Sequence, residues 1–160
     1  MLQESVYYNR ENAQGKAYSQ GLKLGDFIYI SGTLPVDEKD QVVTEDTEAQ
    51  ARKVFANIQT MLESCGMELC HIVKMNVMLT DIQDADAVDR VMKDVFSEPY
   101  PARTISAVAG LEKNARIMID GYAVDTRALE VLCSECNCDE DGDEEGDHDH
   151  ECCDGKTCSF

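Results

Sequence analysis

The sequence predicts one α+β domain in which a six-stranded mixed sheet carries two helices on one face. Two segments repeat hydrophobic residues at intervals of three and four, the period of an α-helix, and six shorter segments are apolar runs or alternate apolar with polar residues. Their order along the chain is βββαβαββ. A chain of 160 residues is long enough for one such domain and too short for two ordinary ones.

The first three strands are expected in the segments 5–8, 17–23 and 27–31. Each is an apolar run between turn residues, and Gly25-Asp26 makes a tight connection between the second and the third. The chain is therefore expected to open as a β-meander.

The first helix is predicted by hydrophobic residues at helical spacing, which are Ala51, Val54, Phe55, Ile58, Met61, Leu62 and Cys65. Thr47 and Gln50 have the spacing of a capping box at its start, and Gly66 is placed to end it. Cys65 and the nearby Cys70 are interpreted as small core residues.

The second half of the domain repeats these signals. The fourth strand, 71–79, alternates and places on one face Val73, Met75, Val77 and Leu79. The second helix is predicted by Ala85, Val88, Val91, Met92, Val95 and Phe96. Pro99 and Pro101 stop this helix. Two final strands, 103–108 and 115–124, are expected on either side of a turn at 110–114.

Two helices cover only one face of such a sheet, so the other face needs a partner. The segment 27–30 (Phe-Ile-Tyr-Ile) is apolar on both faces, whereas a strand facing solvent normally alternates with polar residues. Self-association is the simplest way to cover this face, and clefts between subunits are common ligand sites.

The charge distribution divides the chain. The formal net charge is −18, and residues 133–160 carry eleven acidic residues and one lysine, which leaves −8 for the rest. We therefore expect a domain at 1–128 and an acidic, Cys/His-rich tail at 129–160 that is disordered unless a metal orders it. An acidic body without a basic stripe disfavours binding to nucleic acid or to an anionic membrane. Without a leader or an apolar span, a cytoplasmic location is expected.

The motifs Ala17-Tyr18-Ser19-Gln20-Gly21, Ile30-Ser31-Gly32 and Pro101-Ala102-Arg103-Thr104, at these separations around the two helices, resemble the reactive intermediate deaminase family, also called RidA or YjgF-like. The resemblance covers roughly residues 5–126. It implies a chorismate-mutase-like fold, assembly as a homotrimer and three clefts between subunits. It also implies hydrolysis of 2-imino acids, such as 2-iminopropanoate, to 2-oxo acids and ammonia.

The matching residues suit this chemistry. Arg103 is a permanent cation whose planar fork holds a substrate carboxylate through two hydrogen bonds and so positions the imine carbon for water. A protonated imine is already electrophilic, so an oriented water and donors to the developing charge are sufficient. Tyr18 and the Ser31-Gly32 turn are the candidates for the remaining wall, with Tyr18 expected from one subunit and Arg103 from its neighbour.

This chain departs from the family pattern at several positions. Met118 stands where the resemblance implies a glutamate that positions the water. Asp120, two residues on, faces the same side and is a candidate substitute, or else a charge at the rim or interface. Ile105 stands where many members have cysteine, and a backbone group is expected to contact the substrate there. Thr33 replaces a frequent glutamine and Asp89 a frequent asparagine.

The tail supplies a separate set of candidate metal ligands, which are Cys133, Cys136, Cys138, His148, His150, Cys152, Cys153 and Cys158. Thiols and imidazoles in short-spaced pairs are typical of zinc sites, and the same groups suit Cu(I) or nickel. The alternative is a solvated acidic tail with incidental cysteines. No cofactor is expected for the domain itself.

Three functions follow from these features. The first is the imine or enamine deaminase described above. The second is a non-catalytic trimer that binds a small carboxylate for regulation, as the loss of the glutamate at Met118 would favour. The third is a metal buffer or sensor that acts through the tails.

Overall fold

The structure is a computed structural model and describes residues 3–43 and 46–126. Its strands and α-helices are β1 Gln3–Val6, β2 Gly21–Leu24, β3 Phe27–Thr33, α1 Thr47–Glu63, β4 Ile72–Leu79, α2 Ala85–Val95, β5 Ala102–Ala107 and β6 Ile117–Val124. Short 3-10 helices precede β4, α2 and β6 at Leu69–His71, Ile82–Asp84 and Glu112–Asn114. The predicted order βββαβαββ is confirmed.

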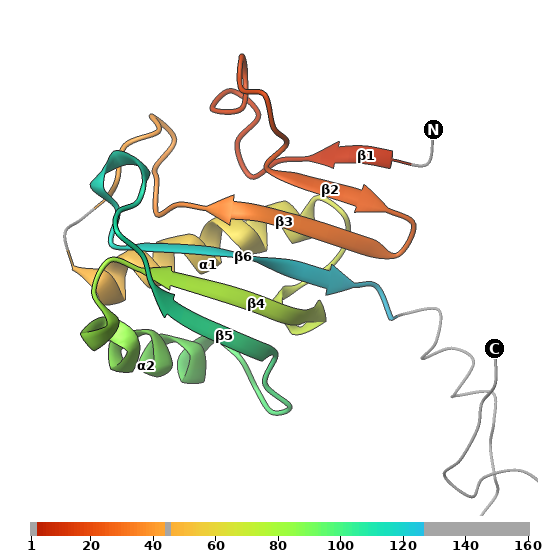
Figure 1. The fold of residues 1–160 in the computed structure, drawn as a ribbon. Coiled ribbons are helices and arrows are strands. Elements are labelled where there is room, and N and C mark those ends of the chain that lie inside the picture. The colour runs from red at the N-terminus through yellow and green to blue at the C-terminus, as the bar shows by residue number, and fades with distance from the viewer. Residues whose placement is uncertain (1–2, 44–45, 127–160) are drawn as a thin grey trace, which may run out of the picture.

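All six strands form one mixed sheet in the order β1-β2-β3-β6-β4-β5 (Figure 1). The first three strands pair antiparallel, as the predicted meander requires. β6 then lies between β3 and β4 and is antiparallel to both, while β5 runs parallel to β4 at the edge. The last two strands are neighbours in sequence but not in the sheet, because α2 carries the chain across to the far side of β4.

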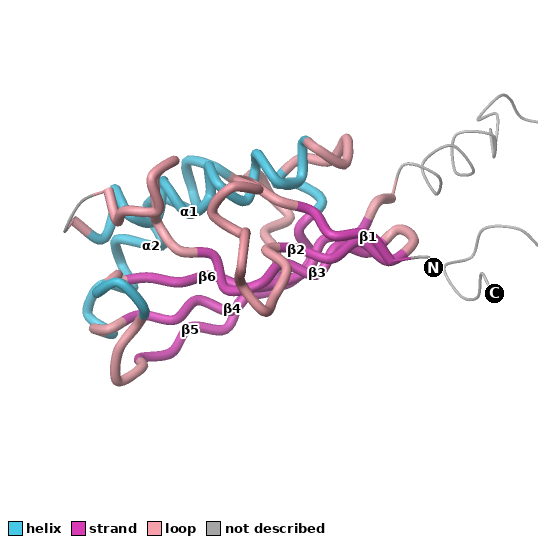
Figure 2. The backbone as a smooth tube through the Cα atoms, turned by 90° about the horizontal axis from the view of Figure 1, so that it is seen from above, coloured by secondary structure: helices cyan, strands magenta, loops and turns pink. Residues whose placement is uncertain are grey.

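Both helices pack on the same face of the sheet, which confirms the predicted layering (Figure 2). The sheet contributes alternate apolar residues to the interface, among them Ile28, Ile30, Val77, Ile117 and Ile119. All five are buried. The phenyl rings of Phe55 in α1 and Phe96 after α2 meet edge to face, with centroids 5.4 Å apart. Burial of this one face supplies most of the driving force for folding.

The predicted capping box of Thr47 and Gln50 at the start of α1 is wrong. Asp46 is the N-cap, and its carboxylate accepts a hydrogen bond of 2.9 Å from the backbone N–H of Ala49. Thr47 is already helical, and its hydroxyl donates to Asp84 at 2.7 Å. The side-chain oxygen of Gln50 accepts from the backbone N–H of Arg116 at 2.8 Å. Tertiary partners have thus taken the two side chains that would have formed the box.

β1 begins and ends earlier than the predicted strand 5–8, and β2 is shorter than the predicted strand 17–23. The reason is that the chain leaves the sheet after Val6. The backbone N–H groups of Tyr8 and Asn9 both donate to the side-chain oxygen of Gln20, each at 3.1 Å. These bonds replace the ladder that a strand at 17–20 would have formed. Residues 7–20 therefore form a loop, and β2 begins at Gly21.

One residue of β4 faces the side opposite to the predicted one. The pairing of β4 with β6 shifts between Ile72 and Lys74, so Val73 is the extra residue of a β-bulge. Ile72 is buried and Val73 is exposed, whereas Met75, Val77 and Leu79 are buried as predicted. A bulge changes the side of the sheet on which the alternation places a residue.

The face of the sheet opposite the helices carries a group of exposed aromatic rings, here called the open face. Phe27, Tyr29 and Tyr122 are 45%, 48% and 40% exposed. The ring of Tyr29 lies 6.5 Å from that of Phe27 and 6.3 Å from that of Tyr122, between centroids. Phe27 and Tyr29 belong to the apolar segment 27–30 that led us to expect self-association, and Tyr122 of β6 extends the group.

Two further predictions concern cysteines and the tail. Cys65 packs against the core, whereas Cys70 is exposed and is not a core residue. It lies in the short turn before β4, where the chain runs along the surface. The tail at 129–160, with the candidate ligands Cys133, Cys136, Cys138, His148, His150, Cys152, Cys153 and Cys158, lies outside the described residues. In residues 3–43 and 46–126, no helix has the length and apolar character needed to cross a membrane.

Candidate functional site

Arg103 projects toward the helices from the edge strand β5. It lies directly across from Met75 in the parallel pairing of β4 with β5, and Met75 is buried beneath the helices. Neighbouring residues in register share a face, so Arg103 lies on the helix-covered side. Because β5 is the last strand of the sheet, the guanidinium stays at the border between core and solvent.

The guanidinium of Arg103 is held by α2. Its Nη1 donates to a carboxylate oxygen of Asp89 and lies 3.4 Å from the sulfur of Met92. The Arg103 side chain is 25% exposed and that of Asp89 is 44% exposed. An ion pair at this depth fixes the direction of the arginine fork more than it stabilises the fold.

Ile105 lies on the same face of β5 and is partly buried, as Arg103 is. It is paired across from Val77 and packs against the hydrophobic core. The predicted contact of residue 105 with a ligand is therefore left to its backbone, since the side chain is directed into the domain.

Ser31 and Gly32 lie in a β-bulge and not in the strand-ending turn that was predicted. β3 continues to Thr33, and its pairing with β6 shifts between Ile30 and Thr33. Bulges often re-aim backbone groups beside functional sites. A Cβ atom on Gly32 would come within 2.7 Å of the sulfur of Met118, so Met118 packs directly over this glycine.

Tyr18 belongs to the loop before β2 and is exposed, so its predicted place in a strand is wrong. The loop is tied to the bulge on β3. The Ser31 hydroxyl donates to the carbonyl of Ser19 at 2.7 Å, and the Ser31 N–H donates to the carbonyl of Gln20 at 3.0 Å. The structure thus brings together the Tyr18 loop, Ser31-Gly32 and Met118.

Asp120 lies on the open face, on the same side of β6 as Met118, as predicted. It is paired across from Asn76, and the Asn76 amide donates to its carboxylate at 2.7 Å. No sequence pattern indicated this partner, because Asn76 becomes a neighbour of Asp120 only through the insertion of β6 beside β4.

The predicted site residues therefore fall into two groups that one chain does not bring together. Arg103 lies on the helix side of β5, whereas Gly32, Met118 and Asp120 lie on β3 and β6, the latter two facing away from the helices. Strands are spaced by about 4.8 Å, so β2, where the Tyr18 loop ends, is about 19 Å from β5 across four intervals. A site that uses both groups requires two copies of the chain.

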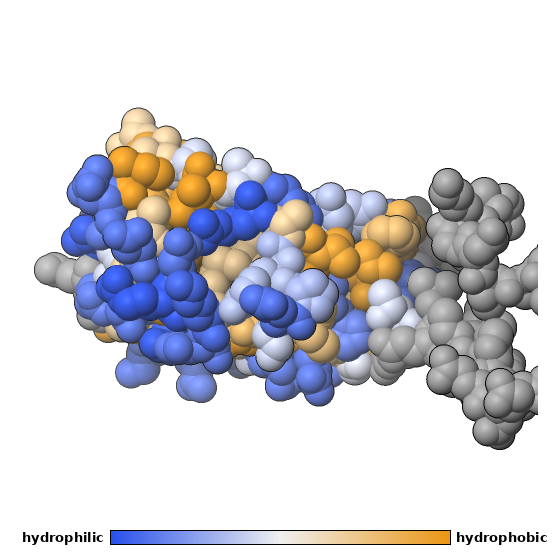
Figure 3. Space-filling view, turned by 90° about the horizontal axis from the view of Figure 1, so that it is seen from below, coloured by the Kyte–Doolittle hydropathy of each residue, from blue (hydrophilic) through white to orange (hydrophobic). Residues whose placement is uncertain are grey.

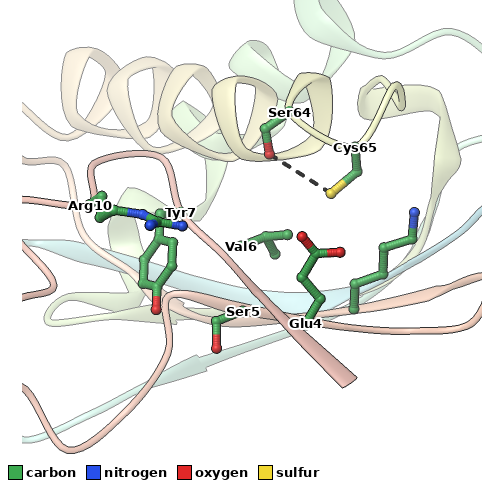
Figure 4. Close-up of a pocket in the computed structure, with 8 residues that line it drawn as sticks. Glu4, Ser5, Val6, Tyr7, Arg10, Ser64 and Cys65 are labelled. Carbon is green, nitrogen blue, oxygen red and sulfur yellow. Dashed lines mark hydrogen bonds between the residues drawn. The ribbon is translucent and has the colours of Figure 1, made fainter. Parts of the chain in front are cut away.

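A hollow that sequence reasoning missed lies between β1 and the end of α1 (Figure 4). Its volume is about 310 Å³, and its lining includes Glu4, Arg10, Lys23, Ser64 and Cys65. These residues belong to segments far apart in sequence and have no motif in common. The hollow contains none of the predicted site residues.

The side of the molecule that carries β5 and α2 is largely hydrophilic (Figure 3). Figure 3 views the molecule from the side of β5 and α2, where hydrophilic side chains cover most of the surface and hydrophobic groups form separate patches. The part of the chain that the structure describes contains no group of three or more His, Cys, Asp or Glu side chains arranged to hold a metal.

Comparison with known proteins agrees with this fold. The sequence model of a protein family described as endoribonuclease L-PSP matches residues 10–125. The 2-iminobutanoate/2-iminopropanoate deaminase of Salmonella typhimurium is 37% identical over 110 residues, which are 67% of this chain and 86% of that protein.

Solved structures are similar over the same region. RidA from an Antarctic Psychrobacter species has a TM-score of 0.67 and 39% identity, and the match covers 71% of this chain and 92% of that one. TdcF from E. coli, solved with bound serine, has a TM-score of 0.65 and 32% identity, covering 69% and 89%. Sequence and fold agree over one continuous domain, and the chain belongs to the RidA/YjgF family, whose sequence model is described as endoribonuclease L-PSP.

Proposed function

We propose that this protein hydrolyses reactive 2-imino acids to 2-oxo acids and ammonia. The observation that carries the proposal is Arg103, a guanidinium fixed at the border of the domain by Asp89 in a member of a family with relatives named imine deaminases. For 2-iminopropanoate, water adds to the carbon of the protonated C=N bond. The C–N bond then breaks, and pyruvate and an ammonium ion leave.

Arg103 holds the substrate carboxylate in this proposal. A guanidinium keeps its charge at any physiological pH and pairs with a carboxylate through two parallel hydrogen bonds. Such a clamp places the imine carbon at a fixed distance from an incoming water, which removes much of the entropic part of the barrier. The protonated imine is electrophilic enough to need no covalent catalyst.

The second wall of the site comes from a neighbouring copy in a homotrimer. Two observations support this assembly: the aromatic open face of Phe27, Tyr29 and Tyr122, and the separation of Arg103 from the Tyr18 loop within one chain. Tyr18 and the bulge at Ser31-Gly32 from one copy then face Arg103 of the next.

Water is positioned without the usual carboxylate at residue 118. A methionine thioether accepts hydrogen bonds only weakly, so Met118 cannot orient water as a glutamate does. Asp120 is the nearest acid on the same face of β6, and its amide partner Asn76 holds it in place. We assign the role of water-orienting acid to Asp120.

The test is pyruvate or ammonia release when the protein is added to a pyridoxal-phosphate dehydratase that produces 2-aminoacrylate. The wild type should accelerate release over buffer, and Arg103→Ala should lose at least about 99% of that acceleration, since both hydrogen bonds of the clamp are lost. Arg52→Ala is the matched control, because Arg52 also pairs with an aspartate of α2, Asp94, but lies away from β5. Equal rates with and without wild-type protein would remove the proposal.

A non-catalytic carboxylate-binding trimer is the second candidate, and Met118 is the observation that favours it. Met118→Glu separates the two. Strong turnover that appears only in this variant would assign binding to the natural protein, whereas turnover in the wild type that falls with Asp120→Asn would assign catalysis.

Ribonuclease activity, which the family description names, is not proposed for this chain. A formal net charge of −18 repels a phosphate backbone, and nucleic-acid binding rests chiefly on cationic contacts to phosphates.

Metal binding by the tail remains a separate proposal. The candidate ligands between Cys133 and Cys158 are soft thiolates and imidazoles, which suit zinc, Cu(I) or nickel. Metal analysis of the full chain and of a chain ending at Leu132 tests it. Equal metal content in the two would refute it.

A further inference from the structure

The pair formed by Arg103 and Asp89 offers a ligand more than a carboxylate clamp. The contact uses only Nη1 of the guanidinium, which also lies beside the sulfur of Met92. Within residues 3–43 and 46–126, Nη2 and Nε make no hydrogen bond. These two nitrogens form one complete edge of the fork, which is the geometry that receives a carboxylate through two hydrogen bonds. This edge could therefore receive a carboxylate without displacing Asp89.

Asp89 changes the charge that such a ligand meets. Arg103 and Asp89 together are neutral, so the site does not attract a simple anion by net charge. The Asp89 carboxylate contacts the same guanidinium, and at 44% exposed it is accessible from solvent. At a separation of a few ångströms near the protein surface, a negative charge repels a monoanion and attracts a cationic group noticeably.

The neutral pair is complementary to one class of molecule. A protonated 2-imino acid or an α-amino acid carries a positive nitrogen on the carbon next to its carboxylate. Its negative group is complementary to Arg103, and its positive group is complementary to Asp89. A 2-oxo acid carries the same carboxylate but a neutral oxygen in place of the nitrogen. The two kinds of ligand therefore differ in the charge of one group, and a negative charge at Asp89 favours the positively charged nitrogen over the neutral oxygen.

We propose that Asp89 is a specificity-determining residue that selects ligands with a positively charged nitrogen beside the carboxylate. The inference rests on the proposed role of Arg103 as the carboxylate clamp. It also accounts for product release, since hydrolysis replaces the charged nitrogen with a neutral carbonyl oxygen. The product then loses its attraction to Asp89 and keeps only its contact with Arg103.

L-Alanine and pyruvate test the proposal, because they share a carbon skeleton and a carboxylate and differ at the nitrogen. Their dissociation constants are measured by calorimetry or NMR titration on the full chain. The ratio of the pyruvate constant to the alanine constant should fall about tenfold in Asp89→Asn, because a charge-assisted interaction is replaced by a neutral one. Asp94→Asn is the matched control, since it makes the same charge change on α2 in an aspartate that pairs with Arg52. Its ratio should stay at the wild-type value.

The outcomes separate this proposal from the one it rests on. An unchanged ratio in Asp89→Asn would overturn the specificity role, even if both ligands bound more tightly, because that result would make Asp89 a mere competitor for Arg103. If Arg103→Ala leaves both constants unchanged, or if the wild type binds neither ligand, the carboxylate clamp itself fails and Asp89 has no role. The ion pair is partly exposed, so neither substitution on α2 should unfold the domain, and thermal unfolding of each variant checks this.

Discussion

On β3, Ile28 and Ile30 are buried beneath the helices, while Phe27 and Tyr29, one position away, keep close to half of their surface exposed. The same strand thus presents an apolar side chain in both directions, and only one direction is covered within the chain. The covered face explains why the domain folds. The exposed rings of the open face are not covered within the chain, which is why self-association remains a prediction for this surface.

The largest expected effect is the loss of folding when a charge is placed on the covered face. Ile119→Asp puts a carboxylate in a buried position of the central strand β6, where it has no partner. The free energy of unfolding should fall by more than about 4 kcal/mol, as measured by urea unfolding followed by circular dichroism. The control Ile82→Asp, at an exposed site before α2, should change it by less than about 1 kcal/mol. Similar losses in both variants would contradict the contrast between covered and open positions.

A smaller loss is expected where two strand backbones approach too closely for a side chain. A Cβ atom on Gly121 would come within 2.2 Å of the carbonyl oxygen of Lys74. Because that neighbour is backbone, Gly121→Ala forces β6 and β4 apart and should cost about 3 kcal/mol. Gly110→Ala is the control, since a Cβ there meets nothing within 4 Å. If denaturant unfolding gave equal stabilities for the two variants, the close approach of β4 and β6 would be wrong.

On the open face, a charge should leave the fold intact and act on assembly. Tyr29→Asp removes the central ring of the aromatic group and places a carboxylate on a surface that is already exposed. The free energy of unfolding of the single chain should change by less than about 1 kcal/mol. The proposed trimer should dissociate, because a buried charge at the centre of an interface is unfavourable. Sedimentation equilibrium measures this, and a variant that keeps the wild-type mass would show that the open face is not the interface.

Much of this fold was predictable because its signals are local. The helical spacing in α1 and α2 and the alternation in β4 and β6 come from residues a few positions apart, and each predicted element exists. The failures occur where a distant partner decides. Asp46 caps α1 in place of Thr47, because the Thr47 hydroxyl donates to Asp84. Val73 is exposed because it is the extra residue of β4 at the bulge in its pairing with β6.

The candidate site residues were proposed from short motifs, and their roles remain predictions. The expectation that Tyr18 and Arg103 come from different subunits was implied by the resemblance and by no local pattern. Tyr18, Ser31-Gly32 and Arg103 belong to short motifs, so resemblance alone identified them. The strand order, which places Arg103 far from the Tyr18 loop, depends on the insertion of β6 between β3 and β4 and has no local signal. The pairing of Arg103 with Asp89 was equally hidden. Asp89 was noted only as a replacement for a frequent asparagine, and its contact with Arg103 depends on how α2 packs beside β5.

The smallest expected effect is a pH dependence at Tyr8, which packs against the main core and against a small buried cluster of Leu34, Val36 and Ala115. Burial, and then the negative charges of ionised Tyr18 and of Asp40, raise the pKa of Tyr8 from 10.0 to about 12. Above pH 10 the unfolded chain loses this phenolic proton while the folded chain keeps it, so stability falls as the pH rises toward 12. Tyr8→Phe removes that loss. Its stability relative to the wild type should therefore rise by about 1 kcal/mol at most between pH 9 and 11, measured by urea unfolding.

Tyr100→Phe, at an exposed tyrosine, is the control. Parallel stability curves for wild type and Tyr8→Phe would mean that the Tyr8 hydroxyl reaches solvent, and that the loop at 7–20 lies less tightly over the covered side than its hydrogen bonds to Gln20 indicate.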